Sequence, residues 1–158
     1  MNPYQMITNN INETQEIAKR LAKYLKPGNV ITLEGDLGAG KTSFTQGLAK
    51  GLEIQQTVNS PTFNIIKEYQ GRLPLYHMDV YRLEDEHEDL GFEEYFFGEG
   101  VTVVEWAENI REFLPKELLN IKISRLEAEN RRLIQFEPIG DQYRELCKEF
   151  FQHENIST

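Results

Sequence analysis

The chain has 158 residues, which fits one domain of ordinary size, and 39% of them are apolar, enough to build a packed core. Its 17 Lys and Arg residues against 26 Asp and Glu residues leave a formal net charge of −9, so the molecule as a whole repels polyanions. This balance argues against strong, independent binding to nucleic acid. The single Cys147 cannot form an internal disulfide, and we find neither a signal-peptide pattern nor an apolar run that would cross a membrane. We therefore expect a soluble, cytoplasmic protein that forms a single domain over residues 1–158.

Helical and extended patterns alternate along the first third of the chain. Residues 11–25 place their apolar side chains on one helical face, and the polar residues 8–10 offer caps in front of it. Residues 30–34 are β-branched and bounded by glycines, which predicts a short buried strand. Residues 41–52 show helical spacing, although Gly47 and Gly51 lower the helix propensity.

The middle of the chain predicts a hairpin followed by an acidic segment. Residues 63–69 and 73–79 are typical of two strands joined by a tight turn, and Pro74 predicts that the second begins at a sheet edge. Seven acidic residues then fall within positions 84–94, just before the aromatic residues 95–97. The favoured interpretation is a solvated helical face with an aromatic anchor. The alternative is an acidic docking surface for a basic partner.

The last third of the chain is again mixed. Residues 101–105 predict a short buried strand, and residues 119–124 and 132–137 alternate like half-exposed strands joined by a turn at 128–131. Residues 142–152 predict a final amphipathic helix.

One sequence motif by itself indicates a phosphate-binding site. Residues 35–42, Gly-Asp-Leu-Gly-Ala-Gly-Lys-Thr, match the phosphate-binding P-loop pattern, and they stand between a predicted strand and a predicted helix. Glycines let the backbone N–H groups wrap a phosphate chain, Lys41 would reach the β- and γ-phosphates, and the Thr42 hydroxyl would bind Mg²⁺. The alternative is a glycine-rich turn with a surface lysine. The predicted phosphate-binding residues are Gly35, Asp36, Leu37, Gly38, Ala39, Gly40, Lys41, Thr42 and Ser43.

These patterns together predict the fold class. We expect an α/β fold, a single P-loop NTPase-type domain with a mixed sheet, a parallel core, antiparallel hairpins and flanking helices.

Two carboxylates end predicted strands, where open α/β sheets bind their ligands. Asp79 and Glu105 are therefore candidates for holding the metal and for orienting the attacking water, unless each only caps the loop that follows it. Ser60, Pro61 and Thr62 lie in the loop after the P-loop helix, where they would be either a switch segment or a turn around the proline.

The sequence gives weaker indications of which nucleotide base is bound and of which residues hold it. The guanine signature Asn-Lys-x-Asp is absent from the sequence, which favours ATP over GTP. Residues 8–10, Ile11 and either Arg131 or Arg132 are candidates for holding the purine. We expect His77 to be structural, and Trp106 to belong to the core or to pack near the site.

Four motifs in this order and spacing resemble one family. The P-loop at 35–42, Ser60-Pro-Thr62, His77-Met-Asp-Val-Tyr-Arg82 and Glu105-Trp106 are similar to those of the bacterial TsaE family of small P-loop ATPases, over roughly residues 8–137. The resemblance implies a part in making threonylcarbamoyladenosine beside the anticodon of tRNAs that read codons starting with A. It further implies binding to TsaD and TsaB, with slow ATP hydrolysis that cycles the transferase, while tRNA is met only through that complex.

The resemblance also assigns roles to residues. It implies ATP and Mg²⁺ as cofactors, with Lys41 and Thr42 on phosphate and metal, Glu105 as the second metal ligand and Asp79 as the carboxylate needed for hydrolysis. Residues 60–62 would be the switch segment, with Trp106 beside it. The remaining nucleotide contacts that it implies are Asn10, Ile11 and Arg131.

Two other functions remain open at this point. A small-molecule kinase would share the P-loop but needs an acceptor pocket and an arginine-bearing lid, whereas the adjacent pair Arg131–Arg132 falls between two predicted strands. A binding module would hold nucleotide without turning it over.

Overall fold

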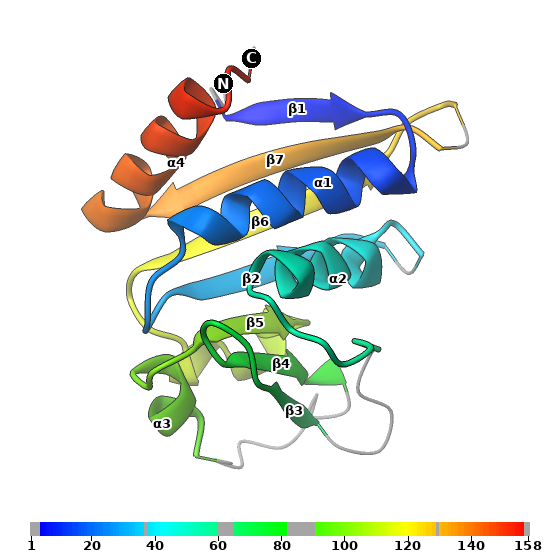
Figure 1. Cartoon of the computed structure of the whole chain (residues 1–158). Coiled ribbons are helices and arrows are strands. Elements are labelled where there is room, and N and C mark those ends of the chain that lie inside the picture. The colour runs from blue at the N-terminus through cyan, green and yellow to red at the C-terminus, as the bar shows by residue number, and fades with distance from the viewer. Residues whose placement is uncertain (1–3, 37, 60–64, 82–90, 129, 157–158) are drawn as a thin grey trace.

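Seven strands form one mixed sheet in the computed structural model, which describes residues 4–36, 38–59, 65–81, 91–128 and 130–156. The strands, in chain order, are β1 (Gln5–Thr8), β2 (Val30–Glu34), β3 (Ile66–Tyr69), β4 (Leu75–Asp79), β5 (Val101–Glu105), β6 (Leu118–Arg125) and β7 (Arg132–Ile139). Their order across the sheet is β1-β7-β6-β2-β5-β4-β3 (Figure 1). Strands β6, β2, β5 and β4 are parallel neighbours, and the pairs at both edges are antiparallel. The predicted fold class is thereby confirmed.

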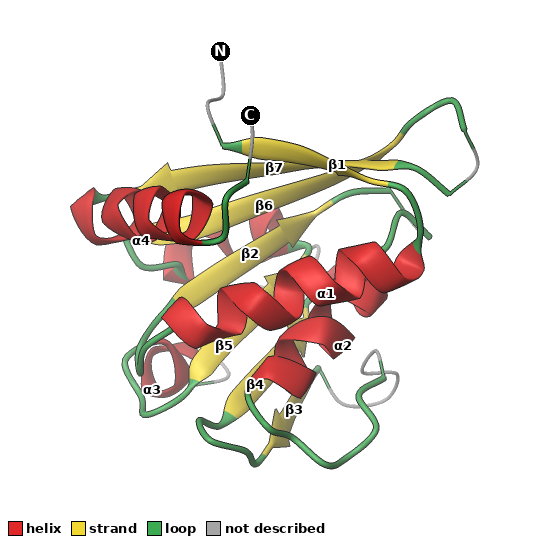
Figure 2. Cartoon of the chain, turned by 45° about the horizontal axis from the view of Figure 1, so that its top comes forward, coloured by secondary structure: helices red, strands yellow, loops and turns green. Residues whose placement is uncertain are grey.

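Helices cover both faces of this sheet. They are α1 (Ile11–Leu21), the short 3₁₀ helix η1 (Ala22–Tyr24), α2 (Lys41–Gly51), α3 (Phe92–Phe96), the 3₁₀ segment η3 (Ala107–Phe113) and α4 (Asp141–His153). Helices α1, α2 and α4 lie on one face (Figure 2) and bury one core against the sheet, while α3 and η3 bury a second, smaller core on the other. Within the described ranges, every helix is too short or too polar to span a bilayer.

The structure corrects several local predictions. Residues 5–8 form β1, which pairs with β7, although we expected no element for residues 5–7 and only a helix cap at Thr8. The segment alternates, with Ile7 48% exposed between the buried Met6 and Thr8, but four residues are too short for the pattern to stand out. The helix predicted for residues 11–25 is α-helical only to Leu21.

The expectation for Pro74 is wrong. Strand β4 is internal, between β5 and β3, and β3 is the edge strand. Pro74 stands one residue before β4, where it lacks an N–H without breaking the ladder, and its carbonyl still accepts a hydrogen bond from the Val101 N–H at 2.9 Å.

The acidic segment is described only at its end. Residues 82–90 lie outside the described residues, and α3 begins at Phe92. The predicted aromatic anchor is confirmed for Phe96, which is buried, but not for Phe97, which is 72% exposed.

Glycines in α2 serve close packing. A Cβ at Gly47 would stand 2.3 Å from the Gln15 carbonyl oxygen, and one at Gly51 would stand 2.4 Å from the Lys19 carbonyl oxygen. Helices α1 and α2 therefore approach so closely that only glycine fits. The two residues that weaken the helix by propensity thus allow the contact that seats α2 on the core.

We expect Gly47→Val to lower the free energy of unfolding by about 3 kcal/mol, because the helices must separate to admit the side chain. Urea denaturation would measure this change. The control is Lys50→Val, which adds the same β-branched residue at an exposed position of α2. Equal denaturation midpoints for the two variants would contradict the packing argument.

Candidate nucleotide-binding site

The P-loop connects the end of β2 to the start of α2. Its last glycine, Gly40, is the N-cap of α2 and has a φ of 119°, in the left-handed region that side chains other than glycine rarely adopt. The loop closes on itself through a 2.9 Å hydrogen bond from the Ala39 N–H to the Asp36 carbonyl. Because Gly40 has no side chain to offer as a cap, the N–H groups of the first turn of α2 face an open pocket. Leu37 lies outside the described residues.

A cavity of 290 Å³ brings eight of the predicted site residues together. Its lining combines the P-loop, the first turn of α2 and the ends of β4 and β5: Gly38, Gly40, Lys41, Thr42, Ser43, Asp79, Glu105 and Trp106. Asp79 and Glu105 are register partners on the parallel strands β4 and β5, so their side chains leave the same edge of the sheet. The predicted convergence of both carboxylates on the P-loop is therefore what the structure has.

A buried chain of polar contacts runs behind this cavity. The Lys41 Nζ lies 3.8 Å from Glu105 Oε1, and the other carboxylate oxygen, Oε2, lies 2.6 Å from His77 Nε2. His77 is 0% exposed, and its Nδ1 has no hydrogen-bond partner among the described residues. The carboxylate of Glu105 is therefore held from one side by the imidazole and from the other by the lysine.

Trp106 lines the cavity beside Lys41 and also packs against the smaller core. The Lys41 Nζ stands 4.6 Å from the centroid of its ring, within range of a cation–π contact, and the Tyr81 ring packs against it at 4.9 Å. Trp106 also has a φ of 63°, unusual for a bulky residue, at the start of η3. Such strain is typical of a residue held in place for a function.

Asp79 differs from Glu105 in its surroundings. Burial raises the pKa of the Asp79 carboxyl above its ordinary 3.8, a hydrogen bond from the Tyr81 N–H opposes this, and the neighbouring Glu105 charge raises the pKa further. The charges of His77 and Lys41 lower it in part. A carboxylate with a raised pKa is a better proton acceptor than an exposed one, which suits a residue that activates water.

Two arginines hold the P-loop from the β6–β7 hairpin. Arg125 Nη2 donates to the Gly38 carbonyl at 3.0 Å, and Arg132 Nε donates to the Ala39 carbonyl at 2.7 Å. The two residues are register partners at the turn end of the hairpin. They fix the loop and add positive charge beside the place expected for phosphates. A second cavity, of 470 Å³, continues from Lys41 and Trp106 along the P-loop residues Gly35 and Asp36 toward Arg125.

The candidates for holding the purine lie beside the loop and not in the phosphate cavity. Thr8 pairs with Arg132, which brings the end of β1 and the start of α1 next to the P-loop. Asn10 is the N-cap of α1, where its side chain accepts from the Glu13 N–H at 2.9 Å, and Ile11 is 58% exposed. Arg131 is exposed at the hairpin turn. In the described structure none of Asn10, Ile11 and Arg131 lines the 290 Å³ cavity.

The candidate switch segment, Ser60 to Thr62, lies outside the described residues. The residues just before it are tied to the fold. The Val58 carbonyl accepts from Gln46 Nε2 at 3.0 Å, and the Asn59 carbonyl accepts from the Tyr69 hydroxyl at 3.4 Å. Val58 and Asn59 are therefore held by side chains of α2 and β3.

Sequence reasoning missed two features of the site. His77, which we expected to be structural, is fully buried, but its hydrogen bond to Glu105 was not foreseen. The usable signal was its position two residues before Asp79, on the same face of β4. Arg125 carried no local signal at all, because its role depends on the pairing of β6 with β2 and β7.

Comparisons with known proteins agree with this geometry. The family model "Threonylcarbamoyl adenosine biosynthesis protein TsaE" matches residues 8–134. The chain is 60% identical over 152 residues to the "tRNA threonylcarbamoyladenosine biosynthesis protein TsaE" of Bacillus subtilis (strain 168), covering 96% of each chain. It is 44% identical over 115 residues to the protein of that name from Treponema pallidum (strain Nichols), covering 72% of this chain and 85% of the relative.

A solved structure is similar throughout its length. The crystal structure of Bacillus subtilis YdiB superposes with a TM-score of 0.84 at 51% identity, covering 96% of this chain and 95% of that one. Since the family model covers most of the chain and the relatives share its sequence at this level, the chain belongs to the TsaE family.

Proposed function

We propose that this chain is an ATP-binding and ATP-hydrolysing component of tRNA threonylcarbamoyladenosine biosynthesis that acts on the TsaD–TsaB transferase complex. The observation that carries the proposal is the single cavity into which Lys41, Thr42, Asp79 and Glu105 converge at the start of α2. Family membership supports the pathway in this proposal, and the residues of the cavity support the nucleotide chemistry.

The residues of this cavity suit a magnesium nucleotide. The N–H groups at the start of α2 and the Lys41 ammonium would hold the phosphates. The Thr42 hydroxyl and the Glu105 carboxylate are oxygen ligands of the kind that Mg²⁺ prefers, and Mg²⁺ takes few of them because it keeps water and phosphate oxygens. The described residues contain no cluster of three or more His, Cys, Asp or Glu side chains placed to hold a metal. The bound metal would neutralise charge on the phosphates during transfer to water.

Three side chains of the site would have separate roles in hydrolysis. Lys41, now 3.8 Å from Glu105, would turn to the phosphates and leave that carboxylate available as a ligand. His77 would keep the Glu105 carboxylate in its orientation through the 2.6 Å contact to Oε2. Asp79 would orient the attacking water and accept its proton, which its raised pKa favours.

The partner assignment fits the charge of the chain. A protein with a net charge of −9 has little attraction for tRNA by itself, but it can dock on a complex that carries the tRNA. The proposed setting is the cytoplasm.

The direct test follows ATP hydrolysis by the purified chain alone and then with TsaB, TsaD and tRNA, while threonylcarbamoyladenosine is measured. We expect hydrolysis to rise with the partners and multiple-turnover modification to require the chain. If the partners leave hydrolysis unchanged and modification proceeds equally well without the chain, the proposal fails.

A positioning role for His77 can be tested separately. We expect His77→Leu to lower Mg²⁺-dependent hydrolysis by about 10- to 100-fold and to raise the Mg²⁺ concentration needed for half-maximal rate, because Glu105 loses the contact that orients it. ATP binding without metal should change little. The matched variant is His77→Gln, whose amide N–H can still reach the carboxylate and should restore part of the activity. Equal losses in both variants would mean that the imidazole serves packing alone.

A further inference from the structure

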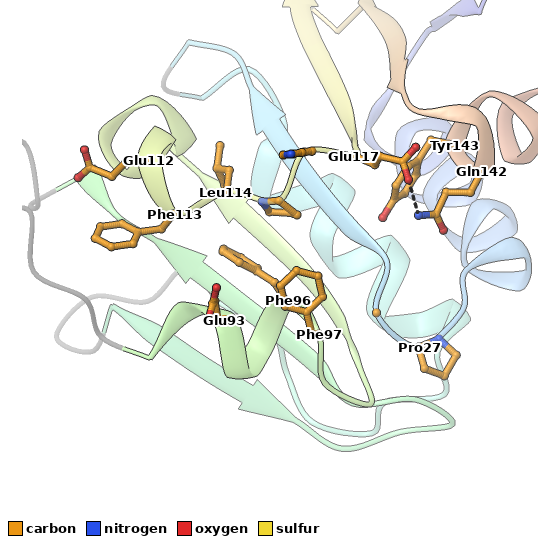
Figure 3. A pocket seen from close by; sticks show the side chains of 13 residues that line it. Pro27, Glu93, Phe96, Phe97, Glu112, Phe113, Leu114, Glu117, Gln142 and Tyr143 are labelled. Atoms are coloured by element: carbon orange, nitrogen blue, oxygen red, sulfur yellow. Dashed lines mark hydrogen bonds between the residues drawn. The ribbon is translucent and has the colours of Figure 1, made fainter.

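A further cavity lies at the end of the sheet opposite the P-loop. Its volume is 760 Å³, and it is formed by the segments that enter β2, β5 and β6 together with the start of α4 (Figure 3). The P-loop, in contrast, follows the carboxyl end of β2. An occupant of this cavity would therefore leave the nucleotide site open. None of its lining residues belongs to the site described above.

Aromatic side chains form the middle of this cavity. Phe96, Phe97, Phe113 and Leu114 gather there in Figure 3, between Glu112 on one side and Glu117 on the other. Phe97 is 72% exposed although it directly follows the buried Phe96. The exposed Phe97 ring therefore offers an aromatic contact to an occupant of the cavity, next to the half-buried Phe113 and Leu114.

The rim of the cavity is acidic. Glu112 lies toward one end of the aromatic group, Glu117 lies toward the other, and Glu93 lies beside it between them (Figure 3). Lys116 is the single cationic residue among the lining residues. The Glu117 carboxylate accepts a hydrogen bond from Gln142 at the start of α4. Glu93 is exposed, and it forms no ion pair with another residue of the described ranges.

We propose that this cavity docks a short segment of another protein in which a bulky apolar side chain is flanked by Lys or Arg residues. The apolar side chain would pack on Phe97 and Phe113, and a flanking cation would face Glu93 at the acidic rim. A second copy of this chain fits less well, because it brings a net charge of −9 to an acidic rim. The proposal does not depend on the nucleotide chemistry proposed above.

The test uses the full chain and a defined probe, a fluorescein-labelled peptide with a central Leu-Phe pair between two Lys-Lys pairs. Fluorescence anisotropy would measure its dissociation constant. Two control peptides carry Glu in place of Lys, or Gly-Ser in place of Leu-Phe. Two variants alter the surface: Phe97→Ser removes the exposed aromatic ring, and Glu93→Lys reverses one rim charge. Glu149→Lys makes the same reversal on the exposed part of α4 and is the matched control.

We expect binding of the probe but of neither control peptide, about tenfold weaker binding by Phe97→Ser and Glu93→Lys, and unchanged binding by Glu149→Lys. ATP binding by Phe97→Ser should equal that of the wild type, which shows that the variant folds and separates this test from that of the nucleotide site. The proposal is overturned if the probe does not bind at millimolar concentration, or if Glu149→Lys weakens binding as much as Glu93→Lys. It is also overturned if sedimentation finds a dimer that Phe97→Ser dissociates, since the surface would then be a contact between copies.

Discussion

Replacing Lys41 with Ala is expected to weaken ATP binding by about 100-fold or more, because each charge-assisted hydrogen bond to phosphate contributes roughly 1.5–3 kcal/mol. The substitution keeps the backbone N–H groups of the P-loop but removes the ammonium that lines the cavity. It also leaves Glu105 without the cation that now stands 3.8 Å away, so the carboxylate would repel the incoming phosphates. Isothermal titration calorimetry with ATP measures the loss directly.

The matched control for this variant is Lys50→Ala. Lys50 belongs to the same helix, α2, but is exposed near its far end, so its loss changes the net charge equally without touching the cavity. Circular dichroism should show the same fold for both variants. An ATP affinity that stays unchanged in Lys41→Ala would exclude this cavity as the phosphate site.

Replacing Asp79 with Asn is expected to reduce ATP hydrolysis by about 10²- to 10⁴-fold, the usual contribution of a general base, while ATP affinity stays within a few-fold of the wild type. The amide keeps an oxygen that can accept the hydrogen bond from the Tyr81 N–H, so the geometry of the β4 end is retained. Steady-state phosphate release and ATP titration separate the two effects. Asp141→Asn, at the exposed start of α4, should leave both unchanged. Hydrolysis at the wild-type rate in Asp79→Asn would remove Asp79 from the proposed mechanism.

The same variant has a second expected result, on stability. Because burial raises the pKa of Asp79 in the folded state above 3.8, the folded protein binds this proton more tightly than the unfolded chain does. As the pH rises above 3.8, deprotonation of Asp79 therefore lowers the free energy of unfolding. This loss of stability is fully present at neutral pH. Asn carries no such cost, so Asp79→Asn should have the higher thermal midpoint at pH 7. The difference should shrink as the pH falls and Asp79 of the wild type becomes protonated. A lower midpoint for the variant at pH 7 would contradict this account.

Local patterns were sufficient for most of the elements. β-branched runs, helical spacing and bounding glycines predict the strands at 30–34, 75–79 and 101–105 and the helix at 41–51. Each of these signals lies within or next to the element that it predicts. The parallel core follows from the alternation of these strands with helices. The strand at residues 5–8 was not predicted, because four residues show too little alternation between apolar and polar side chains to identify an edge strand.

The sequence by itself determined the P-loop and the two carboxylates at strand ends, because a contiguous octet and a terminal strand position are local properties of the chain. The tertiary structure alone decided which side chains meet there. Glu105 bonds to His77, 28 positions away in the chain, because β4 and β5 are parallel neighbours. Arg125 reaches Gly38 because β6 lies beside β2. The cavity around Phe97 likewise exists only where segments entering three strands and one helix come together. Strand order and register set these contacts, and both depend on packing between distant segments, which no local pattern records.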